Sequence, residues 1–296
     1  MNVNFGALAQ NVVFGVFVGG NYGVAAAGLS LVFGVLRVLN IAHGELLMLG
    51  GYISFFLFAV AGVDPFVSVA ISAPALLLFG LVLHRGIFSA VERLDEEDRI
   101  KNSLLISFGL GLILQNVAQL AFTADERSVN TTYAGGSLQL FGLVFPYTRL
   151  LTLGIACLAI IVLDQVLRRT YTGKAIRATS EDWRAAALAG VNIRRTYLIT
   201  FGIGAALAGV AGSLVSVSSS IAPTLGEAWT LKALVVIVLA GMGSIFGAFA
   251  AGILLGAAEA VSTFLFGSTY REVVGLVLFL IVLLVRPQGL FGRGLR

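Results

Sequence analysis

Three polar residues stand close together in an otherwise apolar stretch, and they are the first candidates for chemistry. The stretch GLSLVFGVLRVLNIAHGELLMLGGY, residues 28–52, carries Asn40, His43 and Glu45 within six positions. Ionisable groups inside a membrane are costly, and for that reason they are often functional. These residues could line a substrate path, or His43 could relay protons. Alternatively, Asn40 or His43 caps the start of a helix, with Glu45 in its favourable first turn.

A second set of charges lies near the other end of the chain. Lys232 and Glu259 fall in successive apolar segments. Each would be costly if it were buried alone, and much less so if they were paired, so we predict an intramembrane ion pair. A pathway role for either residue is the alternative. Glu227 and Trp229 lie at a predicted external boundary, where Trp is common as an interfacial anchor.

The composition requires lipid as the solvent. The chain has 296 residues, of which 58% are hydrophobic and 11% charged, and 36 are glycines, which suit closely packed membrane helices. Its single cysteine excludes an internal disulfide. The sequence contains no GxxxxGK[ST] loop and no metal-ligand spacing, so we expect no catalytic site, no bound metal and no cofactor. The net charge of +4 calls for no nucleic-acid partner.

Apolar periodicity predicts an all-α polytopic membrane protein formed by a single domain over residues 1–296. A span needs about 20 residues, and we predict eight to ten membrane helices, with a literal count of nine. The first is long enough to be bent or split at residues 19–21. The predicted spans are 11–36, 41–61, 66–83, 103–122, 147–167, 196–219, 228–243, 245–266 and 270–285.

Two stretches share an outline of apolar run, polar or small-residue break, and second helix. The first is the opening stretch, and the second is 231–259, where Gly241, Gly243 and Ser244 form the break. Paired interrupted helices in two halves of a chain indicate an internal repeat with a transport pathway between the halves. We therefore predict that both breaks, including Asn40, His43 and Glu45, belong to a substrate pathway.

The distribution of basic residues predicts the orientation. Of the 19 Lys and Arg residues, seven lie in 168–195, four in 84–101, and three are Arg286, Arg293 and Arg296. The positive-inside rule makes these regions cytoplasmic. The loop 123–146 contains only one basic residue and is expected outside. Counting nine spans back from a cytoplasmic C-terminus places the N-terminus outside, and a split in the first span would reverse that end.

The stretch 173–195 is too polar to span a membrane, yet it is not loop-like. Thr179 or Ser180 can cap a short helix, with Glu181 and Asp182 in its first turn. Its apolar side is expected to consist of four residues three or four positions apart, namely Trp183, Ala186, Ala187 and Gly190. Because small residues are a poor membrane anchor but allow close contact, docking into a partner protein is favoured over lying on the membrane.

Three stretches, in this order and spacing, resemble one family. They are the opening stretch, GKAIRATSEDWRAAALAGVN and LAGMGSIFGAFAAGILLGAAEA, and the ending LLVRPQGLFGR is also similar. All resemble the permeases of Liv-type ABC importers for branched-chain amino acids, and the H-type more than the M-type. The resemblance implies a permease in a bacterial or archaeal inner membrane, a second permease subunit, two cytoplasmic ATPases and an external binding protein.

The resemblance also assigns 173–195 as the segment that couples the permease to the ATPases. ABC permeases often carry an EAAxxxG pattern there. Ala185, Ala186 and Gly190 match it, but Arg184 stands where the Glu would be, so that Glu181 is the candidate for the polar contact. The implied function is the import of branched-chain or related small amino acids by alternating access. Related permeases for urea, amides or aromatic acids, a proton-coupled secondary transporter, a channel and a scaffold remain as alternatives.

Overall fold

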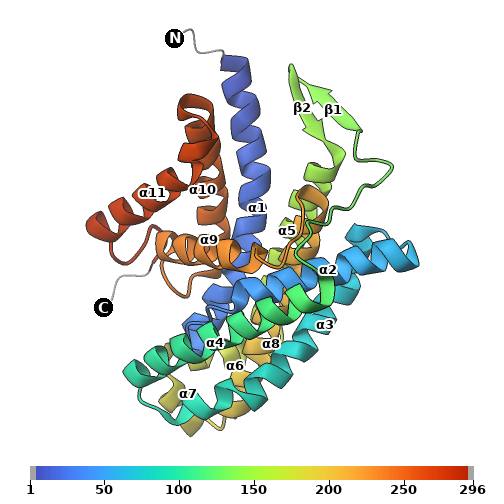
Figure 1. Ribbon diagram of the computed structural model, residues 1–296. Helices are drawn as coiled ribbons and strands as arrows, with labels where there is room; N and C mark the ends of the chain where they lie inside the picture. Colours follow the sequence, from blue (N-terminus) through green and yellow to red (C-terminus); the bar gives the residue numbers. More distant parts are fainter. Residues whose placement is uncertain (1–4, 293–296) are drawn as a thin grey trace.

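The long first helix, α1 (Phe5–Leu36), passes through the middle of the molecule (Figure 1). The computed structural model describes residues 5–292, so Arg293 and Arg296 lie outside the described residues. Because α1 is one continuous helix, a split at residues 19–21 is wrong, and a bend there stays a prediction. Its glycines allow close packing instead: a Cβ atom on Gly19 would lie 2.6 Å from the carbonyl oxygen of Gly252 in α10 (Ile245–Phe266).

Eight helices among residues 5–292 are long and apolar enough to cross a membrane. Besides α1 and α10, they are α2 (His43–Ala61), α3 (Pro65–Gly86), α4 (Glu96–Phe122), α5 (Tyr147–Arg169), α8 (Ile193–Ser218) and a unit of η2 (Ser268–Tyr270) with α11 (Arg271–Val285). The predicted span 228–243 forms α9 (Leu225–Ala240), whose 16 residues are fewer than the ~20 that a span needs. An all-α polytopic membrane protein is confirmed, with one span fewer than the literal count.

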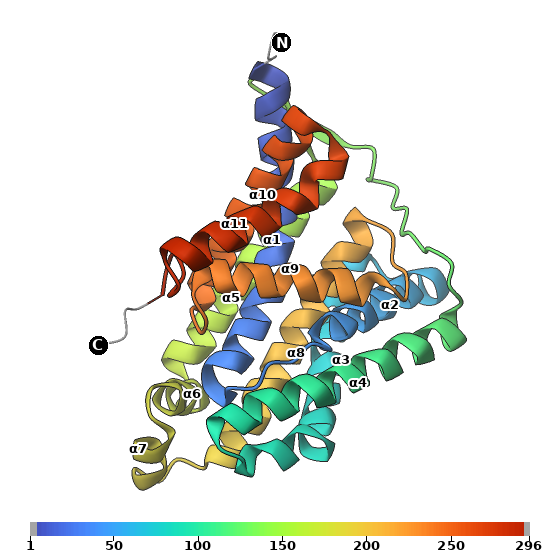
Figure 2. The same cartoon turned by 60° about the vertical axis from the view of Figure 1, so that its left-hand side comes forward.

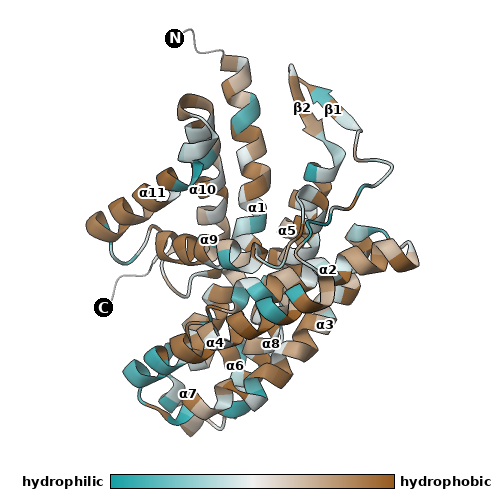
Figure 3. Ribbon diagram, viewed as in Figure 1, coloured by the Kyte–Doolittle hydropathy of each residue, from teal (hydrophilic) through white to brown (hydrophobic). Residues whose placement is uncertain are grey.

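The two ends of the molecule differ in polarity and in the elements they carry. One end holds the start of α1 and a hairpin of β1 (Ser137–Leu140) and β2 (Leu143–Pro146), whereas α6 (Tyr171–Glu181) and α7 (Trp183–Leu188) lie at the other (Figure 1). Hydrophilic residues gather around α7 and the start of α4 (Figure 3). The short η1 (Phe88–Arg93) joins α3 to α4 at the same end. This asymmetry agrees with the charge distribution of the sequence.

Besides the contact of α1 with α10, a second closely packed group of helices is formed by α8, α2 and α3. A Cβ atom on Gly50 of α2 would lie 2.7 Å from the Cα atom of Gly209 in α8, so the two backbones touch. Serine hydroxyls then join the helices, with 2.6 Å between Ser72 of α3 and Ser213 of α8. Small residues and interhelical hydrogen bonds are what hold helices together in lipid, where the hydrophobic effect between them is absent.

The turn between α2 and α3 is anchored by the loop 123–136. Gly62 ends α2 with a φ of 65°, and Asp64 caps α3 by accepting a hydrogen bond from the Phe66 N–H at 2.9 Å. The hydroxyl of Tyr133 donates to the same Asp64 carboxylate at 2.7 Å. This hydrogen bond ties loop 123–136 to the turn between α2 and α3.

Candidate functional site

A cavity of about 440 Å3 lies between α1, α5, α9 and α11, and its size and mixed polar and apolar lining suit a small molecule. Ligand sites commonly measure about 300–1,000 Å3. The middle of α1 forms its inner wall, and the first turns of the other three helices surround it. Its polar lining consists of Asn21, Tyr22, Arg149, Thr152, Ser218, Ser219, Ser220, Lys232, Arg271 and Glu272, and its apolar lining of Phe17, Val18, Leu225, Ala228 and Trp229.

The rim of this cavity faces the end of the molecule that carries the hairpin. Ser220, which lines the cavity, donates a hydrogen bond to the carboxylate of Glu126 at 2.7 Å. Next to it, Ile221 forms an antiparallel bridge with Arg127. The loop 123–136 therefore runs along the mouth of the cavity. In Figure 2, α9 crosses the view between α10 and α8.

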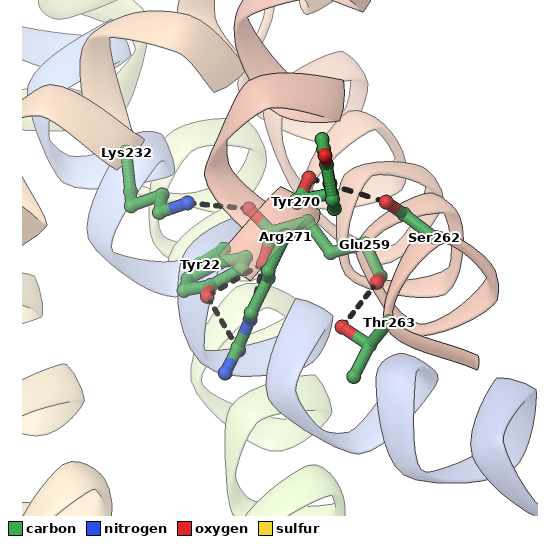
Figure 4. A network of polar contacts seen from close by, with 7 residues as sticks. All are labelled: Tyr22, Lys232, Glu259, Ser262, Thr263, Tyr270 and Arg271. Carbon is green, nitrogen blue, oxygen red and sulfur yellow. Dashed lines mark hydrogen bonds and ion pairs between the residues drawn. The ribbon is translucent and has the colours of Figure 1, made fainter. Parts of the chain in front are cut away.

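A buried charge network around Glu259 of α10 supports the cavity wall (Figure 4). The Glu259 residue is 1% exposed. The Nζ atom of Lys232 lies 2.5 Å from one of its carboxylate oxygens, and Nε of Arg271 lies 3.0 Å from the other. The Tyr22 hydroxyl donates to the carboxylate at 3.1 Å and accepts from Arg271 at 3.0 Å. The structure thus brings the predicted pair of Lys232 and Glu259 together and adds Arg271 as a second cation.

The network leaves an excess of positive charge at the cavity. Two cations share the single carboxylate of Glu259. A third cation, Arg149, lies with its guanidinium 4.3 Å from the centre of the Phe14 ring and forms no ion pair with residues 5–292. The remaining carboxylate of the lining, Glu272, is exposed and also has no ion-pair partner within the described chain. Three cations thus face two carboxylates, which leaves a surplus of one positive charge.

A polar acceptor and an aromatic wall complete the cavity. Asn21 is 3% exposed, and its Oδ1 atom has no hydrogen-bond partner among the described residues. Buried polar atoms are nearly always satisfied, so such an atom on a cavity wall indicates a ligand or water. The rings of Tyr22 and Trp229 pack edge to face with centroids 5.2 Å apart. Trp229 therefore packs against α1 on the cavity lining. The sequence instead predicts that it anchors the chain at the membrane interface.

The polar residues of the first break are buried away from this cavity. Asn40, His43 and Glu45 are 2%, 2% and 4% exposed. The Nε2 atom of His43 pairs with the carbonyl oxygen of Ala25 in α1 at 2.9 Å, and Oδ1 of Asn40 has no partner among residues 5–292. Glu45 does lie in the first turn of α2, against the backbone of Gly226.

Helix capping by Asn40 or His43 is wrong, because other helices cap α2. The hydroxyl of Ser107 in α4 accepts the N–H of Ile41 at 3.0 Å. The hydroxyl of Thr230 in α9 accepts the N–H of Gly44, also at 3.0 Å. Free backbone groups at a helix start need partners, and here three helices meet to supply them.

The second break, residues 241–244, packs against the segment that follows α11. Gly241 and Gly243 have φ angles of 95° and 91°, and Ser244 caps α10 by accepting from Gly247 N–H at 3.2 Å. The N–H of Leu290 donates to the last turn of α9 at 2.8 Å. None of the six residues predicted for a substrate pathway lines the cavity, so their role in a pathway stays a prediction.

The stretch 173–195 folds as two helices, which corrects its predicted start. Asp182 caps α7 by accepting from the N–H groups of Arg184 and Ala185 at 2.8 and 3.1 Å, whereas Thr179 and Ser180 lie inside α6. The predicted apolar side is wrong in one of its members, Gly190, which lies outside α7. Among its four members, Ala186 is buried, Trp183 and Ala187 are exposed, and Gly190 follows the helix with a φ of 87°. Because Gly190 adopts the left-handed conformation, it ends the helix and does not share a face with the others.

Sequence reasoning missed most residues of the cavity, among them Asn21, Tyr22, Arg149 and Arg271. A signal was present for the two arginines. Each opens a predicted span, 147–167 or 270–285, at the end expected outside, where the positive-inside rule disfavours basic residues. Asn21 and Tyr22 carry no such signal, because one helix face cannot be distinguished from another within an apolar run.

Eight helices that can span a membrane, counted within residues 5–292, together with a polar cavity between α1, α5, α9 and α11, indicate a class of protein, a multi-pass membrane permease. Comparison with known proteins gives the family. The model of the family described as "Branched-chain amino acid transport system / permease component" matches residues 11–285. The chain therefore belongs to the family of branched-chain amino acid transport system permease components.

Three relatives show how closely the chain follows this family. It is 35% identical to the high-affinity branched-chain amino acid transport system permease protein BraD of Pseudomonas aeruginosa, over 96% of this chain and 95% of BraD. It is 32% identical to LivH of Escherichia coli K12, over 99% and 98% of the two chains. Identity to LivM of the same organism is 28%, over 91% of this chain and 67% of LivM. The resemblance to the H-type is thereby confirmed.

Proposed function

We propose that the chain is the translocating subunit of an ATP-driven importer for branched-chain or related small amino acids. The observation that carries the proposal is its similarity to BraD and LivH over nearly the whole of each chain. The subunit makes and breaks no covalent bonds. It switches the side to which its cavity opens, and each ligand drives that switch only through its different affinity for the two states.

The proposal places the chain in an inner membrane together with four partner subunits. A second permease subunit related to LivM pairs with this chain, two ATPases bind at the cytoplasmic end, and a binding protein delivers substrate at the hairpin end. The orientation rests on the charges: seven of the 19 Lys and Arg residues lie in 168–195, and the positive-inside rule directs such a segment, together with the C-terminus, to the cytoplasm. The cavity mouth then faces the binding protein.

The coupling role falls to α6, α7 and the residues that follow, 173–195. Exposed apolar side chains support it, since Trp183 is 46% and Leu188 92% exposed at the polar end of the molecule. Such side chains are unfavourable in water and suit a groove in a partner. Glu181 and Arg184 flank them as polar contacts, while Asp182 holds α7 in place.

The test is uptake by the complete transporter in liposomes. The proposal expects leucine uptake only with both ATPases and ATP. In the double variant Glu181→Lys with Asp182→Asn, ATP hydrolysis should continue while uptake falls. Asparagine keeps the oxygen that caps α7, so the helix survives. The control Glu97→Lys changes an exposed acidic residue at the same end, outside the segment, and should transport normally.

Two results would contradict this function. Uptake without ATPases, or uptake abolished by a proton uncoupler while ATP is maintained, would make the chain a secondary transporter. Unchanged coupling in the double variant would mean that another segment contacts the ATPases.

A further inference from the structure

We propose that the cavity binds the transported amino acid as a zwitterion, with Arg149 and Arg271 at its carboxylate, Asn21 at its ammonium group, and Tyr22 and Trp229 against its side chain. This inference rests on the proposed function and deepens it. It gives the permease its own recognition site, in addition to whatever selection the binding protein makes.

The carboxylate end of the site follows from the unbalanced charge. Arg149 and Arg271 line the same cavity, and only Arg271 has a carboxylate partner within residues 5–292. Two like charges at the wall of one cavity are unfavourable unless an anion lies between them. A carboxylate supplies that anion, and guanidinium groups bind it through two parallel hydrogen bonds. Arg271 is free to turn toward a ligand, because its side chain is 44% exposed.

The ammonium end follows from the unpartnered oxygen of Asn21. This residue is 3% exposed, lines the cavity, and leaves Oδ1 without a partner in the described chain. An ammonium group has three donors and no acceptor, so it suits an isolated carbonyl oxygen. The exposed carboxylate of Glu272 on the same lining adds negative potential that attracts an ammonium group toward the cavity.

The apolar part of the lining selects the side chain. The edge-to-face pair of Tyr22 and Trp229 is joined there by Phe17, Val18 and Leu225. Apolar groups with a few convergent polar atoms are the usual composition of a ligand site. Urea and short amides carry neither charge, so they would leave both ends of this site unsatisfied. The arrangement favours a zwitterion with an aliphatic side chain.

The cavity carries its own spectroscopic reporter for a binding test. The chain has two tryptophans, and in the variant Trp183→Phe only Trp229 remains. The full-length variant in lipid nanodiscs is titrated with leucine, with leucinamide, which lacks the carboxylate, and with 4-methylpentanoate, which lacks the ammonium group. We expect a saturable change in Trp229 emission with leucine. Each analogue should bind about 10-fold to 100-fold more weakly, as expected for the loss of a hydrogen bond to a charged group.

Matched substitutions identify the residues. Arg149→Gln should lower leucine affinity by at least about tenfold, while Arg168→Gln should leave it unchanged, because Arg168 is on the same helix but pairs with Asp164 at the opposite end. Asn21→Leu should weaken the binding of leucine more than the binding of 4-methylpentanoate. The reason is that 4-methylpentanoate has no ammonium group to donate to Oδ1 of Asn21. Elution volume and melting temperature show whether each variant is folded, and the analogue series on the parent chain does not depend on any cavity substitution.

The outcomes separate this inference from the proposed function. Equal affinity for leucine and both analogues, an absent leucine response, or equal behaviour of the Arg149 and Arg168 variants would overturn the zwitterion site. If ATP-driven uptake by the complete transporter persisted under those results, the proposed function would stand alone. If leucine bound as expected but the complete transporter moved no amino acid, the proposed function would fail and the site would remain.

Discussion

Replacing Glu259 with glutamine tests whether its carboxylate holds the cavity wall together. The substitution keeps the size of the side chain but leaves Lys232 and Arg271 without their shared anion. Removing one partner of a buried ion pair costs ~3–5 kcal/mol. The contribution of Arg271 is screened, since its side chain is 44% exposed, whereas that of Lys232 is 17% exposed. Because of this screening, we expect Glu259→Gln to lower the free energy of unfolding by about 2–4 kcal/mol, somewhat less than a fully buried pair would give.

Replacing Lys232 should lower the free energy of unfolding less than replacing Glu259. In Lys232→Met, the carboxylate keeps Arg271 and the Tyr22 hydroxyl as partners. The expected loss is about 1.5 kcal/mol, the value of one hydrogen bond to a charged group. The asymmetry between the two variants follows directly from two cations sharing one anion.

The assay is reversible unfolding of the purified chain in mixed micelles, followed by circular dichroism as the fraction of denaturing detergent rises. Glu272→Gln is the matched control. It removes the same charge from the same cavity, but its carboxylate is exposed and has no ion pair within the described residues, so its effect should stay within about 0.5 kcal/mol. Equal stability of the Glu259 and Glu272 variants would refute the role of the network. A larger loss of stability in Lys232→Met than in Glu259→Gln would refute the interpretation that two cations share one carboxylate.

Three further results are expected. Gly212→Leu should abolish folded protein in size-exclusion chromatography, because any Cβ there overlaps the backbone of α2. Thr230→Val should lose about 1–3 kcal/mol of stability, since its hydroxyl caps α2. Thr263→Val should lose less, because its hydroxyl donates to the Glu259 carbonyl within its own helix. Burial and the hydrogen bond to Asp64 raise the pKa of Tyr133 to about 12. The stability difference between wild type and Tyr133→Phe should therefore be present below pH 10 and vanish as the pH rises to 12, and a pH-independent difference would contradict the assignment.

The sequence determined the properties that depend on residue type along one segment. Apolar runs long enough to span a membrane are visible without the fold, because lipid requires every backbone group to bond within its own helix. The polarity of the two ends follows from the spacing of Lys and Arg. The pairing of Lys232 with Glu259 follows from the cost of burying either alone, and the glycines of the second break follow from backbone freedom.

The tertiary structure alone decided which residues share a site. The glycines of α1 were compatible with a split of the helix, but Gly19 and Gly23 pack against α10 within one continuous helix, and nothing local distinguishes the two uses. The caps of α2 come from Ser107 and Thr230, far away in the chain, so no local motif could show them. The cavity joins Asn21, Arg149 and Arg271 from three helices. Segment hydropathy carries no information about which faces of these helices meet, because that is decided by packing between distant parts of the chain.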